Sequence, residues 1–138
     1  NKKNIDILSN SKIIVDAADD WKTSKLLNEF CVKNSINFIF SSVVKHDAQI
    51  IFFDNKSKNN HLCLNCIFPN KNDVDLPRCE TVGISGISAG LAGLITAQKI
   101  INFTLSLRKE TGLLTISDVK QLNIDNIVVN NNHNCYLK

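Results

Sequence analysis

In the first half of the chain, the pattern of apolar and polar stretches predicts a strand followed by a helix, and then two strands that pair with each other. The short β-branched run at residues 12–18 has the pattern of a buried parallel strand. A helix is predicted over residues 21–33. Two further strands are expected at residues 36–44 and 48–53, and the short polar loop between them favours antiparallel pairing. The apolar face of the predicted helix is formed by Leu26, Leu27, Phe30 and Cys31.

The longest apolar stretch, residues 83–107, predicts a helix with small residues along one face. Its glycines, Gly83, Gly86, Gly90 and Gly93, recur at intervals of three or four residues. Such a face would let a strand or another helix approach closely, and it is also typical of a transmembrane dimer. The uncharged segment is shorter than the ~20 residues that span a bilayer, and Lys99 interrupts it. We therefore expect a buried helix in a soluble domain.

Residues 113–117 and 124–129 are two more strand candidates, joined by a polar turn around Asp118. A strand–helix–strand start followed by a later hairpin indicates an α/β fold with a mixed sheet. The whole chain, residues 1–138, is long enough for one domain.

Composition narrows the range of partners and compartments. The net charge is only +3, and the 16 basic residues are scattered without an aromatic-interleaved basic stripe, so nucleic acid is not an expected partner. Five cysteines without a dense regular framework, and no signal peptide before Ile5, favour the reducing cytoplasm. The chain has no methionine, which suggests a processed product or a piece of a longer protein.

Three carboxylates, Asp16, Asp19 and Asp20, follow the first predicted strand. Ligands bind at the carboxyl ends of parallel strands in open α/β sheets, so Asp19 is a candidate for holding Mg²⁺, which prefers oxygen ligands. The alternative is structural, because Asp19 or Asp20 is also well placed to cap the next helix. The spacing alone leaves both interpretations open.

Cys63-x-x-Cys66 is half of a tetrahedral zinc site, and Cys135 is the natural third ligand. The alternatives are a redox pair or plain buried cysteines. A redox pair usually opens a helix after a strand, whereas Pro69 breaks any helix here. The fourth ligand remains open among His61, His133 and a residue beyond Lys138.

Cys79 lies a few residues before the helix predicted from Gly83, and Arg78 precedes it. A thiol near a helix N-terminus has a lowered pKa, which suits a nucleophile. The alternative is a small buried hydrophobe, as lone cysteines commonly are. A Ser-His-Asp order, a phosphate-cradling glycine loop and a His-Glu-x-x-His motif are all absent from the sequence.

These segments, in this order, resemble the ThiF/MoeB/HesA family of ubiquitin-activating-type adenylating enzymes. The segment IIVDAADDWKTSKLLNEFC is similar to the family's strand and helix with the pattern Asp-x-x-Asp-Asn-x-x-Thr-Arg. NFIFSSVVKHDAQIIFF is similar to its next two strands, including Gln49. CLNCIFP resembles its first zinc pair, RCETVGISGISAG its Cys-x-Thr-x-Gly segment, and Asn134-Cys135 the start of its second zinc pair.

The resemblance implies a Rossmann-like mixed sheet and an ATP-dependent adenylating activity. Family members use ATP and Mg²⁺ to adenylate the C-terminal glycine of a small ubiquitin-like protein, which in bacteria is a sulfur carrier for thiamin or molybdopterin biosynthesis. Asp19 matches the carboxylate that works with Mg²⁺ and ATP. Cys79 matches the cysteine that takes over the activated acyl or sulfur group, and Cys63, Cys66 and Cys135 match ligands of a structural Zn²⁺.

The chain also departs from the family pattern. Asp20 stands where Asn is usual, Ser24 where Arg is usual, and Lys138 where the fourth zinc cysteine would be. The match covers the C-terminal half of the family domain, without the Gly-x-Gly-x-x-Gly loop that grips the ATP phosphates. Residues 1–138 are therefore expected to be a single partial domain that does not adenylate on its own.

The resemblance thus predicts part of an adenylyltransferase that engages a ubiquitin-like carrier, as a homodimer or with a partner carrying the N-terminal half. The substitutions at Asp20 and Ser24 favour a rival prediction, a degenerate, non-catalytic member that acts as a protein-binding module. A third prediction is a small domain held together by zinc alone.

Overall fold

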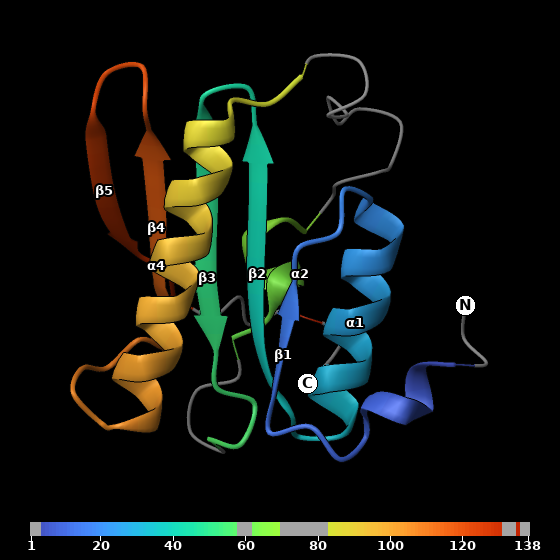
Figure 1. Cartoon of the computed structure of the whole chain (residues 1–138). Helices are drawn as coiled ribbons and strands as arrows, with labels where there is room; N and C mark the ends of the chain where they lie inside the picture. Colours follow the sequence, from blue (N-terminus) through green and yellow to red (C-terminus); the bar gives the residue numbers. More distant parts are fainter. Residues whose placement is uncertain (1–3, 58–61, 70–82, 131–134, 136–138) are drawn as a thin grey trace.

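The computed structural model describes residues 4–57, 62–69, 83–130 and 135, which form a mixed α/β domain (Figure 1). Cys79, His61, His133 and Lys138 lie outside these described residues. The elements, in chain order, are η1 (Ile5–Leu8), β1 (Ile13–Asp16), α1 (Trp21–Lys33), β2 (Asn37–Val44), β3 (Asp47–Phe53), α2 (Leu64–Ile67), α4 (Gly86–Thr104), β4 (Leu113–Asp118) and β5 (Asn123–Val128).

The five strands form one sheet in the order β1-β2-β3-β4-β5. β1 pairs parallel with β2, and Asp16 lies opposite Phe40. The other three pairings are antiparallel. This confirms the predicted mixed sheet and the antiparallel pairing of the second and third strands. β1 is an edge strand in the described part of the chain, because its one neighbour is β2.

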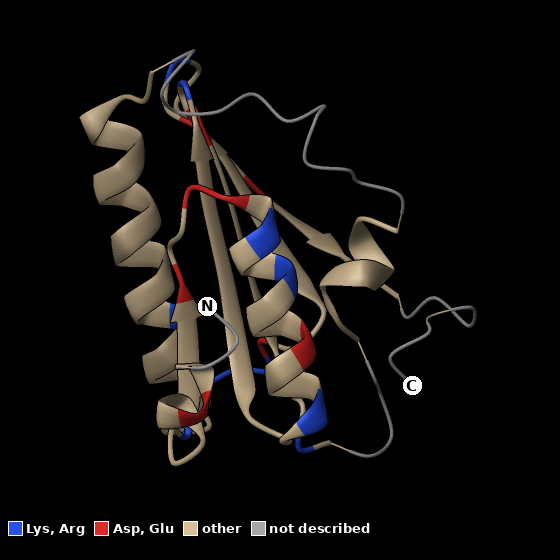
Figure 2. Cartoon of the chain, turned by 90° about the vertical axis from the view of Figure 1, so that its right-hand side faces the viewer, with Lys and Arg blue, Asp and Glu red and all other residues tan. Residues whose placement is uncertain are grey.

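Helices cover both faces of the sheet, with α1 and α2 on one face and α4 on the other (Figures 1 and 2). The central strands β2 and β3 are therefore buried on both sides, which explains their near-continuous apolar sequences. On the α1 side, Phe38 stacks on Phe53 with ring centroids 5.8 Å apart. On the α4 side, the core contains Ile39, Ala48, Ile50, Phe52 and Ala92.

The helix predicted within residues 83–107 forms as α4. Its glycines were predicted to let a strand or another helix approach closely, and the structure does not show this. A Cβ added to Gly86, Gly90 or Gly93 would meet open space, so these positions are not needed for close approach within the described structure. The expectation of a buried helix holds for one stripe of α4 only, because Ile87 and Leu94 are 74% and 71% exposed. The residues of α4 that are buried against the rest of the domain are Ser88, Ala92, Thr96 and Lys99, and no glycine is among them.

Figure 2 shows charged residues along α1 and few along α4. Among the helices that the structure describes, none combines the length and the apolar character that a membrane span requires.

Lys99, which interrupts the apolar run in the sequence, is buried in an ion pair under α4. Its Nζ lies 3.0 Å from Oε2 of Glu110 and donates to the carbonyl oxygen of Leu113 at 3.1 Å. Asn102 Nδ2 donates to the other carboxylate oxygen of Glu110 at 2.7 Å. Burial lowers the pKa of Lys99, and the Glu110 carboxylate partly opposes this effect. The network joins α4 to the start of β4.

Replacing Glu110 with Ala would leave the ammonium group of Lys99 buried without its counter-ion. We expect Glu110→Ala to lower the free energy of unfolding by about 3–5 kcal/mol in urea denaturation. The double variant Lys99→Met/Glu110→Leu should recover most of this loss, because it removes both charges and keeps apolar volume. Glu29→Ala, on the exposed side of α1, is the matched control and should stay within about 0.5 kcal/mol of the parent. A Glu110→Ala effect no larger than that of the control would contradict the stabilising role of the network.

Candidate functional site: an acidic strand end and a cluster of three thiols

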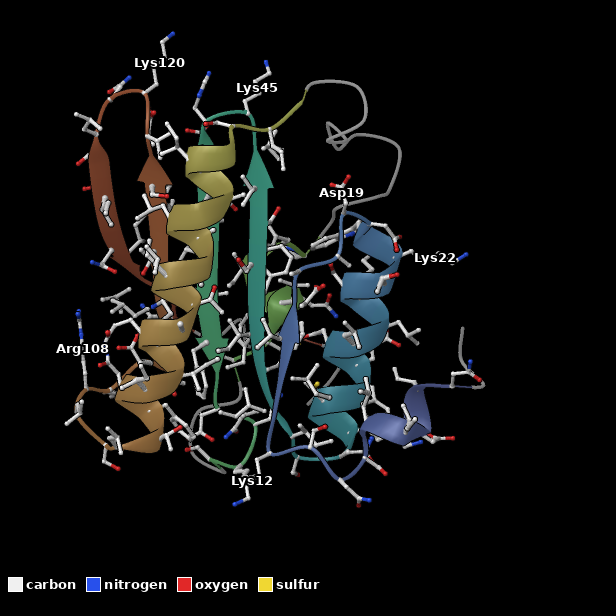
Figure 3. The ribbon with its side chains drawn as sticks, in the orientation of Figure 1. Lys12, Asp19, Lys22, Lys45, Arg108 and Lys120 are labelled. Carbon is white, nitrogen blue, oxygen red and sulfur yellow. The ribbon has the colours of Figure 1, made fainter. Side chains whose placement is uncertain are left out.

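The carboxyl end of β1 carries the three acidic residues that the sequence singled out. β1 ends at Asp16, and α1 begins five residues later at Trp21. Figure 3 shows Asp19 at the turn between them, with its carboxylate directed away from the sheet. Asp19 is exposed, and no side-chain hydrogen bond joins it to the described residues.

Asp20 has a structural role as the N-cap of α1. Its carboxylate accepts hydrogen bonds from the backbone N–H groups of Lys22 and Thr23 at 3.0 and 3.2 Å, and from the Thr23 hydroxyl. These bonds, led by the one from the Thr23 side chain, lower the pKa of Asp20. The capping interpretation is thus confirmed for Asp20, and Asp19 is not the cap of α1.

Asp16 is named with Asp19 and Asp20 among the acidic residues of the sequence, but it is not among the residues predicted to be functional. It is only 1% exposed, and its Oδ1 accepts a hydrogen bond from the Ala18 N–H at 2.9 Å. Its Oδ2 is buried without a hydrogen-bond partner among the described residues. Burial raises the pKa of Asp16, although the Ser24 hydroxyl and the Ala18 N–H lower it in part. The sequence feature that could have identified Asp16 is its position as the last residue of an apolar strand.

Ser24, which replaces the Arg of the family pattern, is buried beside this carboxyl group. Its hydroxyl donates to the carbonyl oxygen of Asp20 at 3.3 Å. The nearby cation Lys22 points outward from α1 rather than toward the strand end (Figure 3). Among the described residues, the strand end is therefore acidic and lacks the cation that the family pattern would place there.

Cys63, Cys66 and Cys135 come together in space. The Sγ atom of Cys63 lies 3.8 Å from that of Cys66 and 3.4 Å from that of Cys135, and all three lie within 4.8 Å of one another. Thiolates on a tetrahedral zinc ion with Zn–S bonds of about 2.3 Å are about 3.8 Å apart. The three sulfur atoms therefore fit one zinc ion as ligands. The predicted meeting of Cys135 with the earlier pair is confirmed.

The turn that carries Cys63 and Cys66 is anchored to the core. Leu64 donates its backbone N–H to Oδ1 of the buried Asn28 of α1 at 2.9 Å, and the Cys66 N–H donates to the Cys63 carbonyl oxygen at 2.9 Å. Cys63 is the N-cap of α2, which has four residues and ends at Ile67 before Pro69. Burial, together with the neighbouring thiols, raises the pKa of Cys63 to about 12. The raised pKa favours the protonated form of the Cys63 thiol in the metal-free chain.

The sequence profile of the ThiF family matches residues 1–137, so the chain belongs to the ThiF family. Its relatives include the adenylyltransferase and sulfurtransferase MOCS3 of Dictyostelium discoideum, 32% identical over 83% of this chain and 27% of the relative. The sulfur carrier protein adenylyltransferase of Thermus thermophilus is 24% identical over 95% of this chain and 50% of the relative. The chain therefore spans half or less of the length of these relatives.

Solved structures show the same fold. The crystal structure of Escherichia coli MccB with MccA-N7isoASN matches with a TM-score of 0.80 at 12% identity, over 99% of this chain and 43% of that chain. MccB with AMPCPP and SeMet MccA matches with a TM-score of 0.78 at 13% identity, over 99% and 42% of the two chains. At these identities the likeness establishes the architecture of the described sheet and helices.

The buried Asp16 should make stability depend on pH in a defined direction. The folded chain holds the Asp16 proton more tightly than the unfolded chain does, because its pKa is raised from the ordinary value of 3.8. The free energy of unfolding must therefore fall as pH rises from this value to the folded-state pKa. We expect the stability difference between Asp16→Asn and the parent, measured by urea denaturation, to shift in favour of the variant across this window. Asp16→Ala should show the same pH dependence with a different offset, and a difference that shifts in favour of the parent would contradict the assignment.

Proposed function

We propose that this chain is part of an ATP-dependent activating enzyme that adenylates the C-terminal glycine of a small ubiquitin-like sulfur-carrier protein. The observation that carries the proposal is the ThiF-family match over residues 1–137, with relatives named as sulfur carrier adenylyltransferases. The free Asp19 carboxylate at the carboxyl end of β1 supports it, because ligands of open α/β sheets bind there.

In the proposed reaction, a carboxylate oxygen of the carrier attacks the α-phosphorus of ATP. A new P–O bond forms, the bond to the bridging oxygen breaks, and pyrophosphate leaves with its electron pair. Asp19 would hold Mg²⁺, which when bound neutralises charge on the phosphates. The contribution of this part of the enzyme is positioning and electrostatics. Asp20 cannot take the place of Asp19, since its oxygen atoms cap α1.

The rest of the catalytic domain is proposed to join at the free edge of β1. Parallel strands are normally buried, yet β1 has a neighbour on one side only within the described structure, and its Val15 is 43% exposed. Because the chain spans about half of its relatives, we propose that this edge pairs with the polypeptide that supplies their other half. A second copy of this chain is the alternative occupant.

We further propose that Cys63, Cys66 and Cys135 hold a structural zinc ion. The convergence of their sulfur atoms supports this, and it would tie the end of the chain to the turn at α2. Cys79 stays a prediction for the acceptor thiol that takes over the activated group.

The second candidate function is a non-catalytic binding module that has kept the fold. Two observations favour it: Asp20 is used as a helix cap, and the buried Ser24 cannot supply the positive charge of the usual Arg. In that case the β1 edge would dock its partner without any chemistry at Asp19.

ATP–pyrophosphate exchange with a ubiquitin-like carrier separates these two functions. The isolated chain is expected to show no exchange. Exchange should appear when the chain is co-produced with the glycine-loop half of a related enzyme, and Asp19→Asn should reduce it roughly a hundredfold or more. Asp47→Asn, on the exposed start of β3, should leave the reconstituted rate unchanged.

Robust exchange by the isolated chain would disprove its dependence on the other half. A reconstituted complex that assembles but remains inactive would favour the binding module. Failure to assemble, together with self-association of the chain, would replace the proposed partner at β1 with a second copy.

Metal analysis tests the zinc proposal. The purified chain is expected to contain about one zinc ion, and Cys63→Ser or Cys135→Ser should remove it, because either change leaves two thiolates. Cys31→Ala is the matched control, since Cys31 lies in the core of the α1 side, outside the cluster, and its loss should leave the zinc content unchanged. Equal zinc content in all of these variants would refute the proposed ligands.

A further inference from the structure

The outward face of α4 presents large apolar side chains to solvent. Ile87, Leu94 and Ile101 recur at intervals of seven residues, and they are 74%, 71% and 46% exposed. Because seven residues are close to two helical turns, the three side chains form one ridge along α4. The ridge points away from the sheet, since the buried residues of α4 lie on the opposite side of the helix. We propose that this face binds the same face of a second copy of the chain, helix against helix.

A groove of small residues runs beside the ridge. Its members are exposed and recur at intervals of three or four residues: Gly86, Gly90, Gly93 and Ala97. A Cβ added at any of the three glycines would meet no atom within 4 Å, so the groove is open on its outer side. A ridge of Ile and Leu next to such a groove makes the face complementary to itself, because side chains of one helix pack into the groove of another. Two copies related by a twofold axis would each supply one ridge and one groove.

The charge pattern of α4 favours an uncharged partner. Its one charged residue, Lys99, is buried against Glu110 under the helix, so the outward face carries no charge. A charged partner surface would lose its hydration there without gaining an ion pair. α1, in contrast, carries charged residues along its length (Figure 2). The second copy offers a face that is equally apolar and equally uncharged.

The position of α4 separates this surface from the edge of β1. α4 packs on β2, β3 and β4 and forms the outermost layer on its side of the sheet (Figures 1 and 2). A polypeptide that extended the sheet at β1 would lie beside α4, whereas the ridge faces outward. Helices on both faces of a sheet already make the three layers of an α/β domain, so a further layer over α4 is expected to come from another molecule. Neither the proposed function nor the occupant of the β1 edge is required for this pairing.

The length of α4 sets the expected strength of the association. The helix has 19 residues and is therefore about 28 Å long. Leu105, which is 63% exposed, prolongs the apolar surface past its last residue. A single helix pair of this length lies near the lower end of specific interfaces, so the dimer should dissociate on dilution.

Sedimentation equilibrium of the full chain tests the proposal. The parent is expected to change from monomer to dimer as its concentration rises. Leu94→Glu places a charge in the ridge and Gly90→Leu fills the groove, so each should weaken the dimer roughly tenfold or more. Gly90→Leu is expected to leave the monomer folded, because the position has open space and Leu favours a helix more than Gly does.

Thermal unfolding of diluted samples separates loss of pairing from loss of folding, and if Leu94→Glu unfolds, Gly90→Leu decides the question. Two controls place changes elsewhere: Glu29→Leu on the exposed side of α1, and Val15→Lys on β1, where the charge disfavours edge pairing. Both should dimerise like the parent. A parent that stays monomeric, a parent that forms larger oligomers, or a dimer that persists in Gly90→Leu would each disprove the pairing. Loss of the dimer in Val15→Lys alone would assign the interface to β1 and disprove it as well.

Discussion

Burial of β2 and β3 on both faces is the constraint on which the rest of the structure depends. Their apolar side chains alternate between a core shared with α1 and a core shared with α4. Because each face must be covered, α1 and α4 are held on opposite sides of the sheet, and β1 and β4 are fixed as the neighbours of the central pair. The positions of both candidate sites follow from this arrangement.

In the acidic site, the short connection between β1 and α1 places three carboxylates in different surroundings. Asp20 caps α1, Asp16 closes the buried end of β1, and Asp19 between them is left exposed. The cap is effective because the Asp20 carboxylate accepts hydrogen bonds from backbone N–H groups of the first turn of α1. Three carboxylates that look equivalent in the sequence thus have different surroundings, and the surroundings raise the pKa of Asp16 while lowering that of Asp20.

The thiol site depends on tertiary structure more strongly. Cys63 and Cys66 are held by the bond between Asn28 and Leu64, which ties their turn to α1. Cys135 lies beside Cys63, although the two are 72 residues apart in the sequence. The family resemblance anticipated this convergence, and local pattern alone suggested it only as one of several possibilities.

The hydrophobic pattern by itself determined the order and type of the main elements, because strand and helix periods are local properties. Residues 21–33 were predicted as a helix and form one with the same ends. The same pattern failed for α4, since a small-residue face and a buried face look alike until the partner is known. Only the tertiary structure decided that Lys99 would pair with Glu110 in the core and that Asp16 would be buried. Solvent exposure and long-range partners depend on how elements pack, which no local period encodes.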